Sequence, residues 1–513
     1  MMTDPLGIYF PATGVTVCAR AVFLAVDNVS LPLKKNLGYY LSKPTVRTEP
    51  VLTPGRGDPN APDALAAHFY GTVLHDGGRF RMWYYPVRLK TKRPPGSFEE
   101  DPMAASESVP FLQGPVCYAE SGDGIRWHKP VLGQVLINGS RENNAIALLD
   151  VAQEGVTVIR DDDPDPQRRY KMVFNYRATG CFQLCTATSG DGLRWRVGPK
   201  LPIAGTAEHA SFYKHNGLYI VSAQAVHSIR SEGGGLCGRQ GSAFVSPDFD
   251  HWMEEAGESF FLAEPPDPRD RGHKKPYPQV HLGVGAASFG NVAVGLYCLW
   301  ENRPQPEIKD WLGRGQTYGD LGLVVSNDGI AFREPARGHV YISRHDSPVT
   351  PVAGARYETI LCQANGIMNV GEETRIYHGR WRDAPDDSLY WGEVALATLP
   401  RDRWGALGLF PGAETGSVWT TPVKLPDAGC DCWLNADGAS EMCVEVADDR
   451  FRLIDGISGA EGGTTPAAGG IECLVAWKGK HLRSLAGQTV RFRVHVRRAG
   501  DIEPRLYAMY LKT

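Results

Sequence analysis

The stretch Ser121-Gly-Asp-Gly-Ile-Arg-Trp127 recurs along the chain and decides the fold. The other copies are Ser189-Gly-Asp-Gly-Leu-Arg-Trp195, Ser326-Asn-Asp-Gly-Ile-Ala-Phe332 and the degenerate Ser246-Pro-Asp-Phe-Asp-His-Trp252. In each copy the aspartate can cap a turn, the glycine can take positive φ, and the aromatic residue can return to the core. We therefore interpret the aspartates as structural, and the uneven spacing of the copies as that of propeller blades with variable loops.

Three strand-like segments can be identified around each copy of this motif. The innermost strands are predicted at 69–75, 145–151, 209–214, 282–289 and 359–365. The last unit ends in Pro400-Arg-Asp-Arg-Trp404 in place of the motif. We expect segment 21–31 to pair with the last blade, because closing the ring removes an exposed sheet edge. The sequence thus predicts an all-β fold built on a five-bladed β-propeller.

The pattern changes after Cys430, where alternating strands are predicted at 442–446, 473–477 and 490–496. Such alternation is typical of a β-sandwich. We therefore expect two domains: a propeller with the ligand site over residues 1–425 and a β-sandwich accessory domain over residues 426–513. The simplest role of the second domain is to pack on the propeller and stabilise it, and sugar binding of its own is the alternative.

The charge of the chain argues against several classes of partner. Its 54 Lys and Arg and 58 Asp and Glu give a formal net charge of -4, too weak a field to predict binding to nucleic acid or to a membrane surface. No apolar run reaches the roughly 18 residues that span a bilayer, and the N-terminus lacks the pattern of a signal peptide. We expect a cytoplasmic protein, although a mature secreted form would look the same. The oligomeric state is not predicted.

The 11 cysteines are scattered, mostly in apolar strand-like runs, and are interpreted as small buried hydrophobic residues. The close pairs, Cys181 with Cys185 and Cys430 with Cys432, lack a second pair at the spacing of a zinc site. We therefore predict no catalytic metal and no cofactor, and leave open a structural metal ion in the propeller channel.

Loop length distinguishes the two faces of the predicted disc. The turns from first to second strand are short, whereas several loops after the second strands and before the first strands are long. Binding and catalytic residues concentrate in long loops on one rim of a rigid scaffold. We therefore expect the ligand site where the innermost strands begin. The polar and aromatic residues at these positions are Asp63, His68, Tyr70, Asn143, Asn144, Glu208, His209, Tyr277, His281, Arg356, Tyr357 and Glu358. Neighbouring loops add Arg177, Glu301, Arg303, Asp320, Arg380, Trp381 and Asp383.

Each of these residues also has a structural interpretation. A lone histidine such as His281 is commonly a core or loop residue, and Asn143 with Asn144 can cap a turn. Taken together, carboxylates and amides from separate segments at equivalent positions favour a shared funnel, because a buried carboxylate without a partner is costly. The segment Arg160-Asp-Asp-Asp-Pro-Asp165 follows an innermost strand, so we place it on the opposite face as an acidic solvated turn.

Several further phrases stand out within residues 20–420: Tyr70-Gly-Thr-Val73, Phe80-Arg-Met-Trp-Tyr84, Cys117-Tyr-Ala-Glu-Ser121, Arg141-Glu-Asn-Asn144, Arg169-Tyr-Lys-Met172 and Ile376-Tyr-His-Gly379. They resemble the five-bladed propeller glycoside hydrolases of the invertase and arabinanase type, and most of all bacterial relatives of glycoside hydrolase family 32. The motifs specify the fold well and the reaction poorly.

The resemblance implies a nucleophile or base on blade one, a steering aspartate on blade two and a glutamate as general acid on blade three. Glu208 fits the third position. Asp63 is the blade-one candidate, although its surroundings depart from the Asn-Asp-Pro-Asn signature of invertases. Blade two offers Asn143 and Asn144 where an aspartate is expected, which puts the mechanism in doubt, and Glu358 is the candidate for the missing second carboxylate.

The function predicted on this basis is glycosidic cleavage, by hydrolysis or transglycosylation, of a furanoside-type or otherwise unusual oligosaccharide. One carboxyl group would protonate the leaving oxygen while an ionised one attacks or activates water. Tryptophans such as Trp381 would stack on sugar faces. Two alternatives stay open. One is a non-catalytic carbohydrate-binding propeller, which the blade-two asparagines favour. The other is a sialidase-like enzyme, although this sequence lacks the cluster of three arginines expected of that class.

Overall fold

The computed structural model describes residues 20–89, 111–149, 152–178, 181–202, 207–225, 240–260, 279–303, 316–384, 386, 388–500 and 502–513. These residues form β-strands joined by turns, and the helices among them are short 3-10 turns such as Leu482–Leu485. The predicted all-β class is confirmed. Within the described ranges, no helix has the length and hydropathy that a membrane crossing requires.

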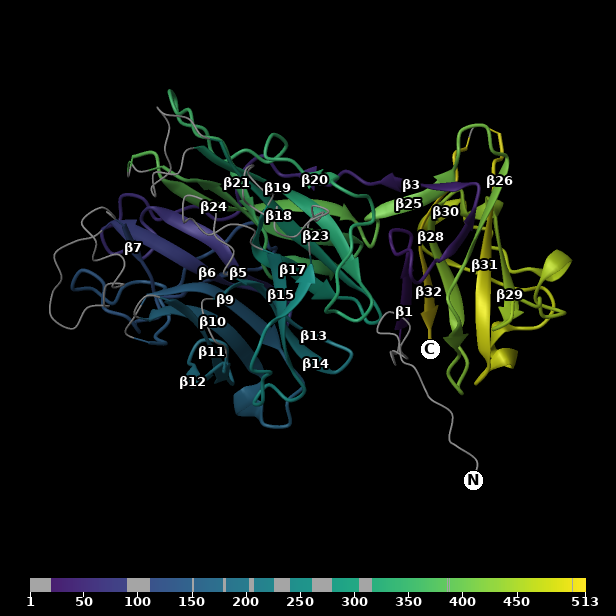
Figure 1. Cartoon of the computed structure of the whole chain (residues 1–513), viewed down its shortest axis with the longest axis horizontal. Coiled ribbons are helices and arrows are strands. Elements are labelled where there is room, and N and C mark those ends of the chain that lie inside the picture. The colour runs from purple at the N-terminus through teal and green to yellow at the C-terminus, as the bar shows by residue number, and fades with distance from the viewer. Residues whose placement is uncertain are drawn as a thin grey trace, which may run out of the picture.

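The larger part of the molecule consists of consecutive antiparallel groups of strands, seen at the left of Figure 1. The first group holds β5 (Ala66–Asp76), β6 (Arg79–Leu89), β7 (Phe111–Gln113) and β8 (Cys117–Ser121). The second holds β9 (Gln153–Arg160), β10 (Tyr170–Ala178), β11 (Cys181–Ser189) and β12 (Arg196–Lys200). The third holds β13 (Ala207–His215), β14 (Leu218–Ala225), β15 (Gln240–Ser246) and β16 (Gly257–Phe260).

Two more groups follow along the chain. The first of them holds β17 (Gln279–Ser288), β18 (Ala293–Arg303), β19 (Gln316–Ser326) and β20 (Val340–Ile342). The second holds β21 (Ile360–Cys362), β22 (Ile367–Val370), β23 (Glu373–Arg382), β24 (Trp391–Pro400) and β4 (Thr45–Val46).

The first strands of these groups contact one another in sequence order, from β5 through β9, β13 and β17 to β22, which in turn contacts β5. Hydrogen bonds join the groups: Val158 N of β9 donates to Thr72 Oγ1 of β5 at 2.8 Å, and Phe212 N of β13 donates to Asn365 Oδ1, between β21 and β22, at 3.0 Å. Thr72 also forms a parallel bridge with Asn365. The first strands therefore complete a closed circuit of contacts.

One predicted innermost strand is wrong. The segment 145–151 does not begin the second group, because β9 occupies that place eight residues later. Ala145 instead bridges Cys117 of β8, so this stretch borders the first group. Both segments carry apolar residues that end up buried, so hydrophobicity alone does not distinguish them.

The repeated motif forms the same turn at every copy, and its predicted structural role is confirmed. In the first copy Asp123 Oδ1 accepts from the backbone N–H groups of Ile125 and Arg126, both at 2.8 Å, while Ser121 Oγ accepts from Gly124 N. Gly124 has φ of 75°, as the sequence predicts. The degenerate copy places Phe249 in this conformation, with φ of 74°.

Each turn also docks on the preceding group of strands. Trp83 Nε1 in the first group donates to Gly192 O of the second at 2.9 Å, and Tyr213 in the third donates to Gly329 O of the fourth. Tyr377 of the last group donates to Gly124 O of the first at 2.9 Å. The motif thus links neighbouring groups, including the last with the first.

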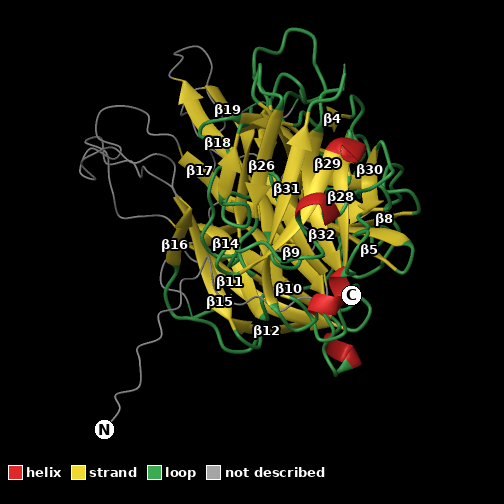
Figure 2. Cartoon of the chain, turned by 90° about the vertical axis from the view of Figure 1, so that its right-hand side faces the viewer, coloured by secondary structure: helices red, strands yellow, loops and turns green. Residues whose placement is uncertain are grey.

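Two further antiparallel sheets occupy the other end of the molecule, at the right of Figure 1. One contains β1 (Arg20–Leu24), β3 (Leu37–Leu41), β25 (Gly405–Leu409), β28 (Asp431–Asp437), β30 (Gly469–Leu474) and β32 (Arg505–Lys512). The other contains β2 (Leu33–Lys35), β26 (Thr415–Trp419), β27 (Val423–Lys424), β29 (Met442–Asp448) and β31 (Thr489–Arg497). Figure 2 shows β31 between β26 and β29.

The expectation that segment 21–31 closes the ring is wrong, since β1 pairs with β32. The reason lies in its apolar alternation. Val22 and Leu24 join the core of the strand groups, while Phe23 joins the core between the two further sheets. A strand buried on both faces therefore connects the two parts, and the sheets do not divide at the predicted boundary of residues 425 and 426.

Candidate functional site

The first strands carry irregularities at their N-terminal ends, all within one rim of the circuit. Pairing is interrupted after His68 in β5, after His209 in β13 and after His281 in β17, where extra residues are inserted. The pairing of β9 with β10 is interrupted in the same way beyond Gln153. Such bulges re-aim side chains and are common next to active sites.

The bulge in β17 has an unusual backbone. Leu282 has φ of 65° and Gly283 has φ of 97°, in the left-handed region that non-glycine residues rarely adopt. A Cβ atom at Gly283 would lie 2.7 Å from the Ala223 carbonyl oxygen, so the close approach of β14 also requires glycine here. This conformation fixes the direction of the neighbouring His281.

Aromatic rings from three groups of strands converge at this rim. We call them the rim cluster: His68, Tyr70, Tyr85, His281, Trp300, Trp381 and Tyr390. His68 stacks on Tyr70 with centroids 5.5 Å apart and meets Trp381 edge-on at 5.1 Å. The ring centroids of His281 and Trp300 are 4.2 Å apart. The structure thus brings together four residues that the sequence analysis singled out: His68, Tyr70, His281 and Trp381.

His68 is a neutral member of this cluster. Its Nε2 lies 2.9 Å from the hydroxyl of Tyr390, and only 3% of the residue is exposed. Burial lowers the pKa of His68 to about 3. The imidazole therefore positions Tyr390 and contributes no charge to the rim at neutral pH.

This lowered pKa predicts a loss of stability in acid. Below about pH 6.5 the unfolded chain binds a proton at this histidine while the folded chain does not, so the free energy of unfolding falls as the pH drops toward 3. We expect His68→Gln to reduce the slope of the free energy of unfolding against pH by about 1.4 kcal/mol per pH unit between pH 6 and 4. Chemical denaturation across this range measures the slope, and the exposed His339→Gln is the control. An unchanged slope in His68→Gln would contradict the assignment.

Two carboxylates act on the phenols of the cluster through their charge. Burial raises the pKa of Tyr70 and Tyr390, and the charge of Glu154 raises both further. Asp383, which is 3% exposed, raises the pKa of Tyr390 as well. Asp383 was among the loop residues predicted near the site.

Glu154 is the residue that the sequence analysis missed. It is the second residue of β9, the strand that was misplaced, whereas Glu208 is the second residue of β13. A signal for it exists in Gln153-Glu-Gly-Val-Thr-Val-Ile-Arg160, which is richer in β-branched residues than 145–151 and matches Ala207-Glu208 in the placement of its glutamate.

Glu208 is held against the bulge of β17. Gln224, opposite it in β14, donates its side-chain N–H to Glu208, and Gln224 Oε1 accepts from Leu282 N at 2.8 Å. Its neighbour His209 turns inward, with Nε2 2.8 Å from Thr157 Oγ1, and burial lowers the pKa of His209 to about 4. Glu208 therefore belongs to the rim, whereas His209 packs between the first strands.

Three other predicted residues gather around Arg344 in the loop that precedes β21. Arg344 Nε donates to Glu358 Oε2 at 2.6 Å and Nη1 donates to Asp320 Oδ2 at 2.6 Å. Tyr357 and Glu358 line a cavity of about 280 Å³ with Arg344 and Arg382. Arg382 and Trp381 are the last two residues of β23, so this cavity lies at the same end of that strand as the rim cluster, with the two side chains on opposite faces of the strand.

Asp63, Asn143 and Asn144 lie elsewhere, in a buried network. Asp63 Oδ2 accepts from Lys129 at 2.5 Å and from Tyr84 at 2.8 Å. Asn144 donates to the hydroxyl of Tyr84 at 2.9 Å, and Asn143 caps a turn by accepting from Ala145 N. These contacts commit the three side chains to the packing of the first group.

Arg380 is buried as well, at 1% exposure. Its Nε donates to Ser347 Oγ at 2.8 Å and its Nη1 to the Thr48 carbonyl at 2.8 Å, so it joins two loops. The side chain of Arg177 lies outside the described residues.

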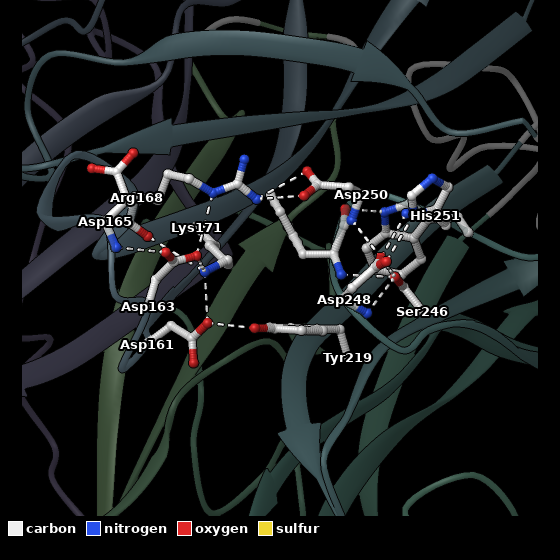
Figure 3. A network of polar contacts seen from close by, with 12 residues as sticks. Asp161, Asp163, Asp165, Arg168, Lys171, Tyr219, Ser246, Asp248, Asp250 and His251 are labelled. Carbon is white, nitrogen blue, oxygen red and sulfur yellow. Dashed lines mark hydrogen bonds and ion pairs between the residues drawn. The ribbon is translucent and has the colours of Figure 1, made fainter.

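On the opposite face, the segment after β9 forms an ion-pair network, shown in Figure 3. Lys171, which has no exposed side-chain surface, lies 2.6 Å from Asp161 and 2.7 Å from Asp163. Arg168 pairs with Asp250 of the third group through two bonds of 2.9 and 2.8 Å. The prediction of a solvated turn is wrong for Asp161, because burial beside Lys171 makes it part of the core.

Across the described residues, no three histidine, cysteine or acidic side chains are arranged to hold a metal ion. The rim supplies carboxylates, phenols, imidazoles and indoles as chemical groups.

Comparisons with known proteins give distant likenesses. No protein-family model matches the chain. Two Mycobacterium tuberculosis relatives, the uncharacterized proteins MT1551 and Rv1502, are each 28% identical over 173 residues, which is 33% of this chain. The chain thus spans about half, 46%, of the length of the curated relatives it matches.

Similar solved structures include a glycosyl hydrolase from Bacteroides ovatus, 15% identical with a TM-score of 0.42, covering 72% of this chain and 95% of that one. A β-1,2-mannobiose phosphorylase from Listeria innocua is 14% identical with a TM-score of 0.42, covering 71% and 97%. A family 43 arabinoxylan arabinofuranohydrolase from Bacillus subtilis is 11% identical with a TM-score of 0.36, covering 87% and 95%. Likenesses this distant carry no argument about the reaction, and the resemblance to invertases stays a prediction.

Proposed function

We propose that the strand groups are the five blades of a β-propeller, that the two further sheets form a β-sandwich, and that the rim of the propeller cleaves a glycosidic bond. The closed circuit of first strands and the docking of each motif on the preceding group support the ring. The substrate that we propose is a furanoside-type or otherwise unusual oligosaccharide.

The observation that carries this proposal is the equivalent placement of Glu154 and Glu208. Each is the second residue of a first strand, on neighbouring groups, at the end where pairing is interrupted. The charge of Glu154 raises the pKa of Tyr70 and of Tyr390, and Glu208 is tied through Gln224 to the strand that carries His281. Two carboxyl groups at one rim are what glycosidic cleavage requires.

In this proposal one of the two carboxyl groups gives its proton to the leaving oxygen as the glycosidic bond breaks. The other, as a carboxylate, attacks the anomeric carbon or takes a proton from the attacking water. The packed rings of the rim cluster hold these groups in place and keep competing water away. Asp63 is not used, because its contacts fix it in the first blade.

The test is turnover across a panel of aryl glycosides and unactivated furanose and pyranose oligosaccharides, with methanol added to one arm. Release of sugar supports hydrolysis, and a methyl glycoside product supports transglycosylation. Sugar binding without any turnover would overturn the enzyme proposal in favour of a carbohydrate-binding propeller. NMR of the first-formed anomer then separates retention from inversion.

A further inference from the structure

The cavity beside the rim cluster is bounded by balanced charges. Arg344 is paired with Asp320 and Glu358, each at 2.6 Å, and Arg382 supplies a second guanidinium at the same cavity. Arg344, Arg382 and Glu358 line the cavity, and Asp320 balances Arg344 from outside the lining, so the two positive and two negative groups leave little net field to attract a charged ligand. A ligand that both donates and accepts hydrogen bonds, as a hydroxyl group does, suits such a lining.

Part of the cavity is apolar. Pro348, Val349, Pro351 and Val352 line it, and Val352 is 39% exposed. A sugar ring presents C–H faces and hydroxyl edges, so a lining that combines proline and valine with paired ions matches both. The volume of about 280 Å³ lies just below the range of roughly 300–1,000 Å³ typical of drug-sized ligands, which suits one sugar unit.

The loop that forms this cavity is held in place from below. Ser347 Oγ lies 2.7 Å from His378 Nε2, and Thr350 donates to Glu393 through its N–H at 3.0 Å and its hydroxyl at 2.6 Å. Val349 N donates to Thr359 Oγ1 at 2.8 Å. A cavity fixed by buried partners loses little entropy when it binds a ligand.

The cavity is also next to the proposed reaction site. Arg382 Nε donates to the Leu389 carbonyl at 2.6 Å, directly before Tyr390 of the rim cluster. Arg344 lies over the ring of Tyr318, which donates to Glu301, the residue after Trp300. A ligand in the cavity would therefore lie at the same strand ends as the rim cluster.

We propose that this cavity is a preformed subsite for one uncharged sugar unit, adjacent to the unit whose bond is cleaved. The position next to the cleaved unit rests on the proposed function, whereas sugar binding in the cavity can be tested without turnover. Glu358 then acts in binding, by balancing Arg344, and not as a catalytic carboxylate.

The first test fills the cavity. Val352→Trp is expected to weaken binding of neutral methyl glycosides, measured by saturation-transfer NMR and calorimetry, by at least about tenfold, because the indole occupies the space of the ring. The matched control is Val340→Trp, whose valine is 38% exposed in β20 and does not line the cavity. It should stay within about twofold of wild type. No binding to wild type, or equal binding by Val352→Trp, would overturn the proposal.

The second test changes the charge of the cavity. Wild type should prefer methyl glucoside over methyl glucuronide, and Glu358→Gln should shift this preference toward the glucuronide by roughly tenfold at low salt, because Arg344 is then only partly neutralised. A wild type that prefers the glucuronide, or an unchanged preference in Glu358→Gln, would contradict the inference.

The two proposals fail differently. If glycosides are cleaved but Val352→Trp leaves KM unchanged, the subsite is wrong and the reaction stands. If Val352→Trp blocks sugar binding but no glycoside is cleaved, the reaction is wrong and the binding site stands.

Discussion

Replacing Glu208 or Glu154 with glutamine is expected to lower kcat on an unactivated glycoside by roughly 10²–10⁴-fold each, the usual contribution of a positioned acid or base. Glutamine keeps the shape of the side chain and its ability to accept a hydrogen bond, but it can neither give up a proton nor carry a negative charge. Circular dichroism and thermal denaturation should show folded proteins, so the loss would be chemical.

The leaving group tells the two roles apart. The variant that lacks the acid should lose far less activity on a dinitrophenyl glycoside than on an alkyl one, because a good leaving group needs no proton. The variant that lacks the nucleophile or base should lose activity on both substrates, and added azide should restore part of it. Steady-state kinetics on the two substrate classes gives the assignment.

A matched control lies at the other end of a neighbouring strand. Glu373 is the first residue of β23, at the end away from Trp381, with 51% of its side chain exposed. Glu373→Gln should keep wild-type kinetics. If Glu208→Gln and Glu154→Gln are as active as Glu373→Gln, the catalytic assignment is wrong and the carboxylates serve binding or packing.

Lys171→Met is expected to destabilise the protein by about 3–5 kcal/mol, since it leaves two acidic groups packed together without their buried counter-charge. Lys171 lies between Asp161 and Asp163 with no exposed side-chain surface, and Tyr219 also donates to Asp161. Chemical denaturation at pH 7 measures the loss.

Lys214→Met is the control, because Lys214 pairs with the same Asp161 at 3.0 Å from a side chain that is 43% exposed. An exposed pair of this kind contributes about 1 kcal/mol or less. Equal effects of the two substitutions would show that burial of Lys171 adds nothing.

The pH dependence gives a second measure of this network. Burial alone would raise the pKa of Asp161, but hydrogen bonds from Lys171, Tyr219 and Lys214 outweigh it and the pKa is lowered. The stability that this carboxylate contributes is present above its unfolded pKa of about 3.9 and is lost as the pH falls toward the folded value. The difference in free energy of unfolding between wild type and Lys171→Met should therefore become smaller below about pH 4.

The sequence by itself determined the turns and the strand class. Each motif closes through contacts within a few residues, as between Asp123 and Arg126, so its conformation could be predicted from local chemistry. The N-terminal ends of the first strands follow from the order of strands and turns. Histidines and carboxylates such as His68, His281 and Glu208 could therefore be assigned to one rim from that order alone.

Only the tertiary structure decided which of those side chains meet. Asp63 and Asn144 form hydrogen bonds with Tyr84 and are not part of the rim, because a buried polar group bonds to the partner that packing places within reach. Glu154 enters the rim because β9, and not the equally apolar stretch before it, packs between β5 and β13. β1 pairs with β32 because each face of β1 is buried in a hydrophobic core at that position. Such choices depend on contacts between residues far apart in the chain, for which hydrophobic pattern and spacing give no information.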